Sequence, residues 1–263
     1  MERVKHNFAV FILESEGASD LVDRRSEGEG LERLLPLMEY KCVLRKADCR
    51  AAFLNHLEVF SRSGCEILHI SCHGNTQGLG LTNGDFVTWV ELFAALKKTN
   101  VPFILNLSSC EATGQDELIK LFNSSDDRPF MIAGSSESLT WDEAFIAWGL
   151  IYRAHTSKEE GSFQCMCDAM AAIQLSLSRR FRATWFREKK DSEPGEDKFK
   201  AECFDSGLLL DKFQQYHIEM GRNEISKEFE SAEAAQASLN RANNLGADVQ
   251  GRQDELPEII DNN

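Results

Sequence analysis

Two apolar runs, Ile67-Leu68-His69-Ile70-Ser71-Cys72-His73-Gly74 and Phe103-Ile104-Leu105-Asn106-Leu107-Ser108-Ser109-Cys110, decide the fold class of this chain. Each run has the length of a buried strand and ends in reactive side chains. If the two strands are neighbours in one parallel sheet, His73 and Cys110 meet at its carboxyl edge, where open α/β sheets hold their active sites. An imidazole beside a thiol is the pair that a cysteine hydrolase requires.

The segments around these runs alternate between strand and helix patterns. Further strands are predicted at residues 8–13, 40–44, 129–134 and 184–186. Helices are predicted at residues 31–38, 51–60, 89–98, 113–122, 140–155 and 162–177. Because the two patterns alternate, we expect parallel strand pairing with right-handed crossovers. The sequence therefore predicts an α/β fold, with a mostly parallel sheet flanked by helices.

Two local signals follow the first of the two runs. Asn83-Gly84 lies between apolar residues and predicts a hairpin turn, because both residues tolerate positive φ. Thr88 is expected to cap the helix at residues 89–98, and Glu91, three positions on, completes a capping box. We therefore expect a small hairpin beside the end of the third strand.

The charge is strongly negative and concentrated late in the chain. Lys and Arg number 29 against 43 Asp and Glu, which gives a formal net charge of −14. Such a surface repels phosphate backbones and anionic lipid, so neither nucleic acid nor membrane is expected as a partner. Residues 191–263 hold 17 acidic and 7 basic residues. We predict a main domain over residues 1–190 and an acidic, mainly helical extension over residues 191–263, with a mobile tail.

The cysteine pattern bears on the compartment. The 8 cysteines lie within apolar runs of a mid-sized chain, whereas disulfide frameworks are typical of small, loop-rich chains. The apolar stretch at residues 8–13 is too short for a signal sequence or a membrane span. These features predict a reduced, cytoplasmic protein.

A thiol attacking a peptide carbonyl needs a base, donors for the oxyanion and an acid for the leaving amine. His73 can serve as the base and then the acid. Cys110 precedes a predicted helix, whose amino end favours negative charge on the sulfur. The amides of Gly74 and Cys110 are the expected oxyanion donors. Asn106 and Glu111 are both open as a third catalytic member, since nothing in the spacing selects either.

Competing sites are less well supported. Zinc favours ligands in paired short spacings, which the available side chains do not provide, so no metal and no cofactor are predicted. The candidate ligands are His69, Cys72, His73 and Cys110. The glycine-rich segment at residues 74–84 lacks the Gly-Lys-Ser/Thr of a phosphate loop. Ser108 and Ser109 lack the Gly-x-Ser-x-Gly pattern of a serine nucleophile.

Residues 68–74, the hairpin at 79–86 and Leu107-Ser108-Ser109-Cys110-Glu111-Ala112-Thr113-Gly114 resemble the CHAT family of caspase-like peptidases. The resemblance covers roughly residues 5–190. It implies a three-layer caspase/hemoglobinase-like fold in which His73 and Cys110 form the catalytic dyad and the Gly74 region helps to hold the oxyanion. It also implies a regulated protease of bacterial antiviral defence, which cuts a partner protein such as a gasdermin-like pore former.

The chain departs from that family after the fifth strand. The family's Ser-Leu-Trp-x-Val-x-Asp element is replaced by Ser135-Ser136-Glu137-Ser138-Leu139-Thr140-Trp141-Asp142. Glu137 or Asp142 is a candidate to bind a basic substrate side chain next to the cleaved bond. The alternative is that Thr140 and Asp142 cap a helix. The caspase signature Gln-Ala-Cys-x-Gly is absent, so cleavage after aspartate is not predicted.

The sequence thus predicts a cysteine-type endopeptidase, a thiol protease with a protein substrate and a regulatory protein partner. Two alternatives stay open. One is a catalytically silent caspase-fold binding or adaptor module that docks through the acidic segment at residues 191–263. The other is a thiol hydrolase that cuts a non-peptide acyl bond.

Overall fold

The computed structural model describes residues 8–23, 25–99, 103–110, 116–123, 129–155, 162–188 and 199–205. These residues all belong to one compact unit, which runs to Leu210. The predictions for residues 111–115, directly after Cys110, and for residues 206–263 lie outside the described residues. No helix in the described ranges has the length and apolar character needed to cross a membrane.

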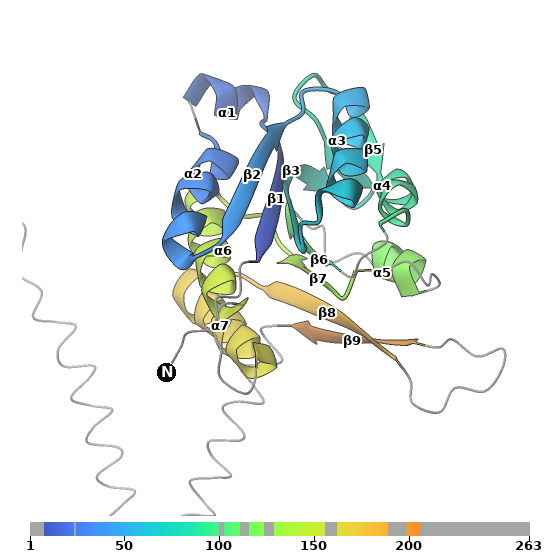
Figure 1. Cartoon of the computed structure of the whole chain (residues 1–263). Helices are drawn as coiled ribbons and strands as arrows, with labels where there is room; N and C mark the ends of the chain where they lie inside the picture. The colour runs from blue at the N-terminus through green and yellow to red at the C-terminus, as the bar shows by residue number, and fades with distance from the viewer. Residues whose placement is uncertain are drawn as a thin grey trace, which may run out of the picture. The chain divides into compact units, whose positions relative to one another are not determined.

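A nine-stranded sheet forms the centre of the unit (Figure 1). Its main path runs in the order β2-β1-β3-β6-β7-β8-β9, and the β4–β5 hairpin is attached to β3. The strands are β1 (Ala9–Ser15), β2 (Lys41–Lys46), β3 (Ile67–Asn75), β4 (Gly78–Gly80), β5 (Phe86–Thr88), β6 (Ile104–Ser108), β7 (Met131–Ser135), β8 (Phe181–Glu188) and β9 (Phe199–Asp205). The pairs from β2 to β7 are parallel, as the alternation of strands and helices predicts.

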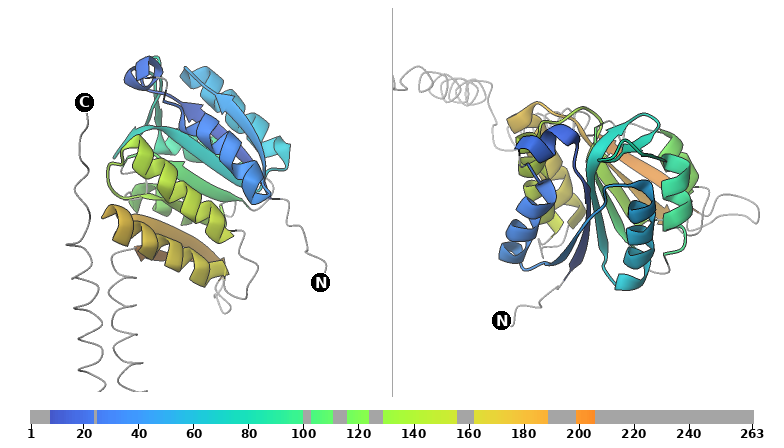
Figure 2. Two further views of the ribbon diagram at one scale, coloured as in Figure 1. Left: turned by 90° about the vertical axis from the view of Figure 1, so that its left-hand side faces the viewer. Right: turned by 90° about the horizontal axis from the view of Figure 1, so that it is seen from above.

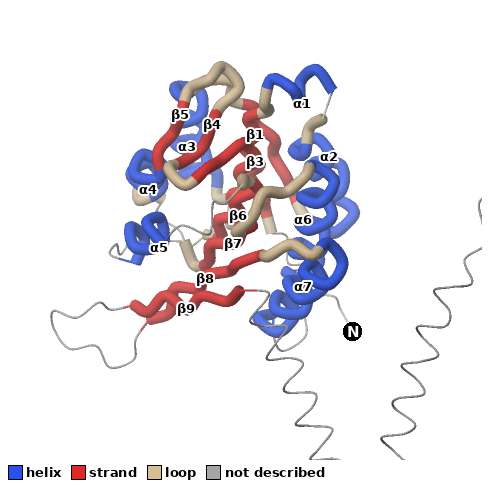
Figure 3. Tube along the Cα trace, turned by 180° about the vertical axis from the view of Figure 1, so that it is seen from behind, coloured by secondary structure: helices blue, strands red, loops and turns tan. Residues whose placement is uncertain are grey.

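Helices cover both faces of the sheet, as the view from above shows (Figure 2). They are α1 (Ala18–Asp23), α2 (Glu27–Leu34), the 3-10 turn η1 (Leu35–Met38), α3 (Arg50–Ser63), α4 (Trp89–Leu96), α5 (Asp116–Asn123), α6 (Trp141–His155) and α7 (Ser162–Leu177). The helices α3, α4 and α5 pack on one face, and α2, α6 and α7 on the other (Figure 3).

The alternating side chains of β1 feed two separate cores. Phe11 and Leu13 belong to the core under α3, α4 and α5, whereas Val10 and Ile12 belong to the core under α2 and α6. All four are essentially inaccessible to solvent. A strand that is buried on both faces appears as an unbroken apolar run in the sequence, which is why β1 was predictable. The predicted α/β architecture, with three layers and a mostly parallel sheet, is confirmed.

The last part of the sheet differs from the prediction. β8 spans eight residues rather than the short strand predicted at residues 184–186, and it pairs antiparallel with β7. β9 then pairs antiparallel with β8, so the sheet continues beyond residue 190, where the sequence predicts the end of the main domain. No strand was predicted at Phe199–Asp205, because its polar alternation lies in a charge-rich segment.

The local signals after β3 are confirmed. β4 and β5 pair antiparallel, and Gly84 in the turn between them has a φ of 89°. Thr88 caps α4: its hydroxyl accepts a bond from the Glu91 amide at 3.2 Å, and the Glu91 carboxylate accepts one from the Thr88 amide at 2.9 Å. This hairpin fixes the end of β3, where the candidate site lies.

Candidate active site

The strands β3 and β6 present a row of polar side chains on the face covered by α2 and α6. Alternate residues of a strand point to the same face. The side chains in this row are His69, Ser71 and His73 from β3, with Asn106, Ser108 and then Cys110 from β6 and the residues after it. The register pairs His69 with Asn106 and Ser71 with Ser108. His73 continues this row on β3, and Cys110 follows two residues after the end of β6.

Gly74 allows the two strand ends to approach each other. A Cβ at this position would lie 2.9 Å from the Ser109 Cβ and 3.1 Å from the Cys110 carbonyl oxygen. Both values are shorter than ordinary contacts between carbon and these atoms. The backbone that follows His73 therefore packs directly on the backbone at Cys110, as the sequence predicts for adjacent parallel strands. A side chain on residue 74 would separate them.

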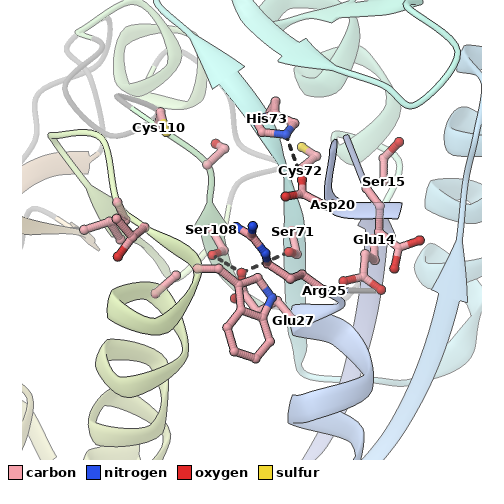
Figure 4. Close-up of a pocket in the computed structure, with 16 residues that line it drawn as sticks. Glu14, Ser15, Asp20, Arg25, Glu27, Ser71, Cys72, His73, Ser108 and Cys110 are labelled. Atoms are coloured by element: carbon pink, nitrogen blue, oxygen red, sulfur yellow. Dashed lines mark hydrogen bonds and ion pairs between the residues drawn. The ribbon is translucent and has the colours of Figure 1, made fainter. Parts of the chain in front are cut away.

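His73 and Cys110 line a common pocket with a volume of about 270 Å³ (Figure 4). Among the described residues, four carboxylates and one guanidinium, that of Arg25, also line it. The carboxylates belong to Glu14, Glu16, Asp20 and Glu27. Cys110 itself is partly buried. The pocket is therefore acidic and open to a ligand that reaches the thiol.

The His73 imidazole is held by Asp20, a residue that sequence reasoning missed. The His73 Nε2 atom lies 3.0 Å from the Asp20 Oδ2 atom. The Gly17 amide also donates to this oxygen, at 3.1 Å, and thereby fixes the carboxylate. When Nε2–H donates to Asp20, Nδ1 is the nitrogen left to accept a proton from a thiol. The pair is solvent-accessible, since the side chain of His73 is 61% exposed.

Gly17 leaves the space that this imidazole occupies. A Cβ on Gly17 would lie 2.2 Å from the His73 Nε2 atom and 2.9 Å from the Asp20 Oδ2 atom. Gly17 connects β1 to α1, a six-residue helix that was not predicted because its apolar residues Leu21 and Val22 are exposed. Without buried residues at helical spacing, a short helix has no signal in the sequence. An acid just after a strand that ends at the same sheet edge was the available clue to Asp20.

Cys72 is the second thiol in the pocket, and it is not a competing nucleophile. Burial, followed by the charge of Glu27 and the proximity of Cys110, raises the pKa of the Cys72 thiol well above its usual value. The reactive form of cysteine is the thiolate. Cys72 therefore stays protonated and unreactive near neutral pH.

The buried carboxylate of Glu14, a residue of β1, holds the start of α2 against the sheet. Its carboxylate accepts bonds from the Gly28 amide and the Ser26 hydroxyl, both at 2.7 Å. Burial raises the pKa of Glu14, and these two bonds offset part of that effect. Lys46 lies 3.7 Å from the same carboxylate. Burial lowers the pKa of Lys46, but the hydrogen bonds that its ammonium group donates to Glu29 and Glu16 outweigh burial and raise that pKa above its usual value.

Glu137 and Asp142 do not line the pocket in the described part of the chain. The Glu137 carboxylate accepts a bond from the Arg180 amide at 3.2 Å instead. Asp142 accepts one from the Thr140 hydroxyl at 2.7 Å, and this bond lowers the pKa of Asp142. The Thr140 amide donates to Glu143 in the first turn of α6, at 2.8 Å. These contacts favour the helix-cap alternative over binding of a basic substrate side chain.

Neither candidate for a third catalytic member, Asn106 or Glu111, is found in the described lining of the pocket. Asn106 is fully buried opposite His69 and does not line the pocket, so its position does not support a role as third catalytic member. Glu111 lies outside the described residues, as does the predicted helix start at Thr113; α5 is described from Asp116. Among the described residues, no group of three or more His, Cys, Asp or Glu side chains is placed to hold a metal ion.

An imidazole oriented by a carboxylate, and a thiol in the same pocket at the carboxyl edge of a parallel sheet, together define a candidate Cys–His hydrolase site on an α/β fold. The sequence matches no protein-family model and no curated protein. The resemblance to the CHAT family therefore stays a prediction.

Solved structures similar to this chain include the following two. One is a complex of Porphyromonas gingivalis RgpB pro- and mature domains, with a TM-score of 0.43 and 11% sequence identity, over 65% of this chain and 43% of that chain. The other is a structure of pro-sf-caspase-1, with a TM-score of 0.42 and 11% identity, over 78% of this chain and 96% of that chain. The chain thus spans less than half the length of the RgpB chain.

Proposed function

We propose that this chain is a cysteine endopeptidase in which Cys110 is the nucleophile and His73 the base. The observation that carries the proposal is the His73 imidazole, held by Asp20 at the pocket that Cys110 also lines. The carboxylate keeps the proton on Nε2 and stabilises the imidazolium that forms when Nδ1 accepts the thiol proton. Neither effect requires any further group.

The proposed reaction has two stages, formation of a thioester and its hydrolysis. His73 takes the Cys110 proton, and the sulfur attacks the peptide carbonyl carbon to form a tetrahedral intermediate. The amides of Gly74 and Cys110 are the donors proposed for its oxyanion. The C–N bond then breaks, and His73 returns the proton to the leaving amine. Water, activated by the same imidazole, hydrolyses the thioester and restores the thiol.

The resemblance to CHAT peptidases extends the proposal to a biological role. In that role the chain is a cytoplasmic, regulated protease of bacterial antiviral defence. Its substrate is a partner protein, such as a gasdermin-like pore former, and a second protein controls it. The acidic segment at residues 191–263 is the proposed contact surface for that regulator, because it concentrates the negative charge of the chain.

The test is cleavage that depends on Cys110. The full chain and its Cys110→Ala and His73→Ala variants are each incubated with a peptide library prepared from a bacterial proteome, and new termini are identified by mass spectrometry. Cys49→Ala is the matched control, since Cys49 is another partly buried free thiol and lies outside the pocket. We expect cleavage by the wild type and the control only. Cleavage that survives Cys110→Ala removes Cys110 from the mechanism.

One observation favours a second candidate, the catalytically silent binding module. Among the residues that the structure describes, four carboxylates and one guanidinium line the pocket, and nearby negative charge in general disfavours a thiolate. Labelling with iodoacetamide separates the two candidates. Labelling of Cys110 that is no faster than that of Cys49 at neutral pH favours the binding module over the peptidase. Faster labelling of Cys110 that requires His73 supports the peptidase.

A further inference from the structure

Glu27 is a buried carboxylate that reaches the polar face of the sheet from the start of α2. It is the first residue of that helix and only 6% exposed. Gly28 lets this helix begin close to the sheet, because a Cβ on residue 28 would lie only 2.7 Å from the Leu44 Cδ1 atom. A carboxylate is favourable in the first turn of a helix. Its burial is still costly unless its oxygens are bonded.

The Glu27 carboxylate bridges β3 and β6. Its Oε2 atom accepts bonds from the Ser71 hydroxyl at 3.0 Å and the Ser108 hydroxyl at 2.8 Å, as the dashed lines in Figure 4 show. Ser71 and Ser108 are partners in the register of the two strands. Ser71 lies two positions before His73 on the same face of β3, and Ser108 lies two positions before Cys110, which follows the end of β6. A single oxygen thus joins the two strands at the last paired position before His73 and Cys110.

A third bond fixes the carboxylate itself. Its Oε1 atom lies 3.1 Å from the His69 Nε2 atom, and the His69 Nδ1 atom lies 3.0 Å from the Tyr152 hydroxyl. Burial holds the pKa of Tyr152 well above its usual value, so the phenol is a donor. His69 Nε2–H then donates to Glu27. His69 also packs edge-on against Trp148, with ring centroids 4.9 Å apart. The carboxylate is therefore tied to α6 as well as to both strands.

The position of this bridge matters because the backbone ladder between β3 and β6 ends at Ser71 and Ser108. Beyond it, β3 pairs with β4, and Cys110 lies past the end of β6. The two serine bonds are thus the last side-chain ties between the strands before the dyad. Apolar side chains at these positions would pack the core without the cost of burying a charge.

We infer that Glu27 is a positioning residue, whose carboxylate sets the separation of the His73 imidazole and the Cys110 thiol by holding Ser71 and Ser108 together. This inference rests on the proposed function. Proton transfer requires the two groups within hydrogen-bond reach, and a misplacement of about 1 Å lowers a rate by about 100-fold. Loss of either serine bond frees one strand end to shift by part of that distance.

The experiment measures the rate of Cys110 alkylation by iodoacetamide as a function of pH, together with the melting temperature. The variants are Ser71→Ala, Ser108→Ala and Glu27→Gln, with His73→Ala as the reference for an unpaired thiol. Ser135→Ala is the matched control. Ser135 is also buried at the carboxyl end of a neighbouring strand, but it donates to the Glu137 and Arg180 carbonyl oxygens and not to Glu27.

A paired thiol is alkylated below the pH range of a free thiol, because the imidazolium stabilises the thiolate. We call the alkylation of Cys110 in this lower pH range the acidic limb. We expect Ser71→Ala and Ser108→Ala to lower the alkylation rate in the acidic limb by about 10- to 100-fold, as for other residues that orient reacting groups. Ser135→Ala should lower the melting temperature by a similar amount and keep the limb.

The two possible failures are distinguishable. A wild type without an acidic limb, equal to His73→Ala, refutes the proposed function itself. A wild type with the limb, retained in both serine variants, overturns only the role of Glu27. The serine variants decide this point even if Glu27→Gln does not fold, because they remove one bond each and leave the carboxylate with two other donors.

Discussion

Gly17 lies so close to the His73 imidazole that one added methyl group should separate catalytic competence from stability. In Gly17→Ala the new Cβ would lie 2.2 Å from Nε2 and 2.7 Å from Cδ2 of His73. Since atoms in contact are normally about 3.5 Å apart, the ring must move by about 1 Å. It is able to do so, because the His73 side chain is 61% exposed. The displaced ring then loses the Asp20 carboxylate.

The fold should tolerate this change. Gly17 is not among the glycines with positive φ, so alanine adopts its backbone conformation, and such substitutions commonly stabilise by about 0.4 to 1 kcal/mol. We expect the acidic limb of Cys110 alkylation to fall by about 100-fold, with a change in unfolding free energy within about 1 kcal/mol.

Gly149→Ala in α6 is the matched control for Gly17→Ala. Its Cβ would meet only the Leu34 Cδ2 atom, at an ordinary distance of 3.6 Å. This control should be stabilised by about 0.5 to 1 kcal/mol and react as the wild type does. Unchanged alkylation in Gly17→Ala would show that the orientation of His73 toward Asp20 is irrelevant to the thiol.

Three further predictions concern the same site and the core behind it. Gly74→Ala should lower the alkylation rate of Cys110 at pH 6 by about 10-fold, because the added Cβ pushes the two strand ends apart; an unchanged rate contradicts the close packing. Asp20→Asn keeps an acceptor for His73 but removes the charge, so the rate at pH 6 should fall by about 10-fold and recover at high pH. His155 has its pKa lowered to about 4 by burial, so the folded state resists its protonation and stability falls as the pH drops below about 6.5. In urea titrations, the loss of unfolding free energy between pH 7 and pH 5 should be smaller by about 1 to 2 kcal/mol in His155→Phe than in the wild type, and an equal loss refutes the assignment.

The strands β3 and β6, which lead to His73 and Cys110, were predictable because burial on both faces leaves a continuous apolar run in the sequence. Polar residues at alternate positions of those runs then stand out, and His73 is the clearest case. β9 left no such pattern, since it is an outer strand of alternating polarity within an acidic segment. The sequence therefore predicts the central part of the sheet better than its last two strands.

The acids that contact the candidate site were not predictable for a different reason. Asp20 meets His73 across 53 positions of sequence, and Glu27 meets Ser108 across 81. Both acids lie in or beside short helices, in segments rich in Glu, Asp, Gly and Ser, where an acid is ordinarily a solvated surface residue. Only the way α1 and α2 pack on the sheet edge selects these two acids from the 43 acidic residues in the chain.

The acidic pocket and a reactive thiol are compatible only if His73 carries the compensating positive charge. Two opposite charges about 4 Å apart attract by roughly 1 to 4 kcal/mol in the range from water to a protein surface. The carboxylates that line the pocket carry the opposite sign, so in the proposed mechanism His73 is the group that balances the charge of a thiolate. In the proposed mechanism, Asp20 stabilises the imidazolium and thereby the ion pair as a whole. Reactivity of Cys110 should therefore depend more steeply on the presence of His73 than it would in a neutral pocket.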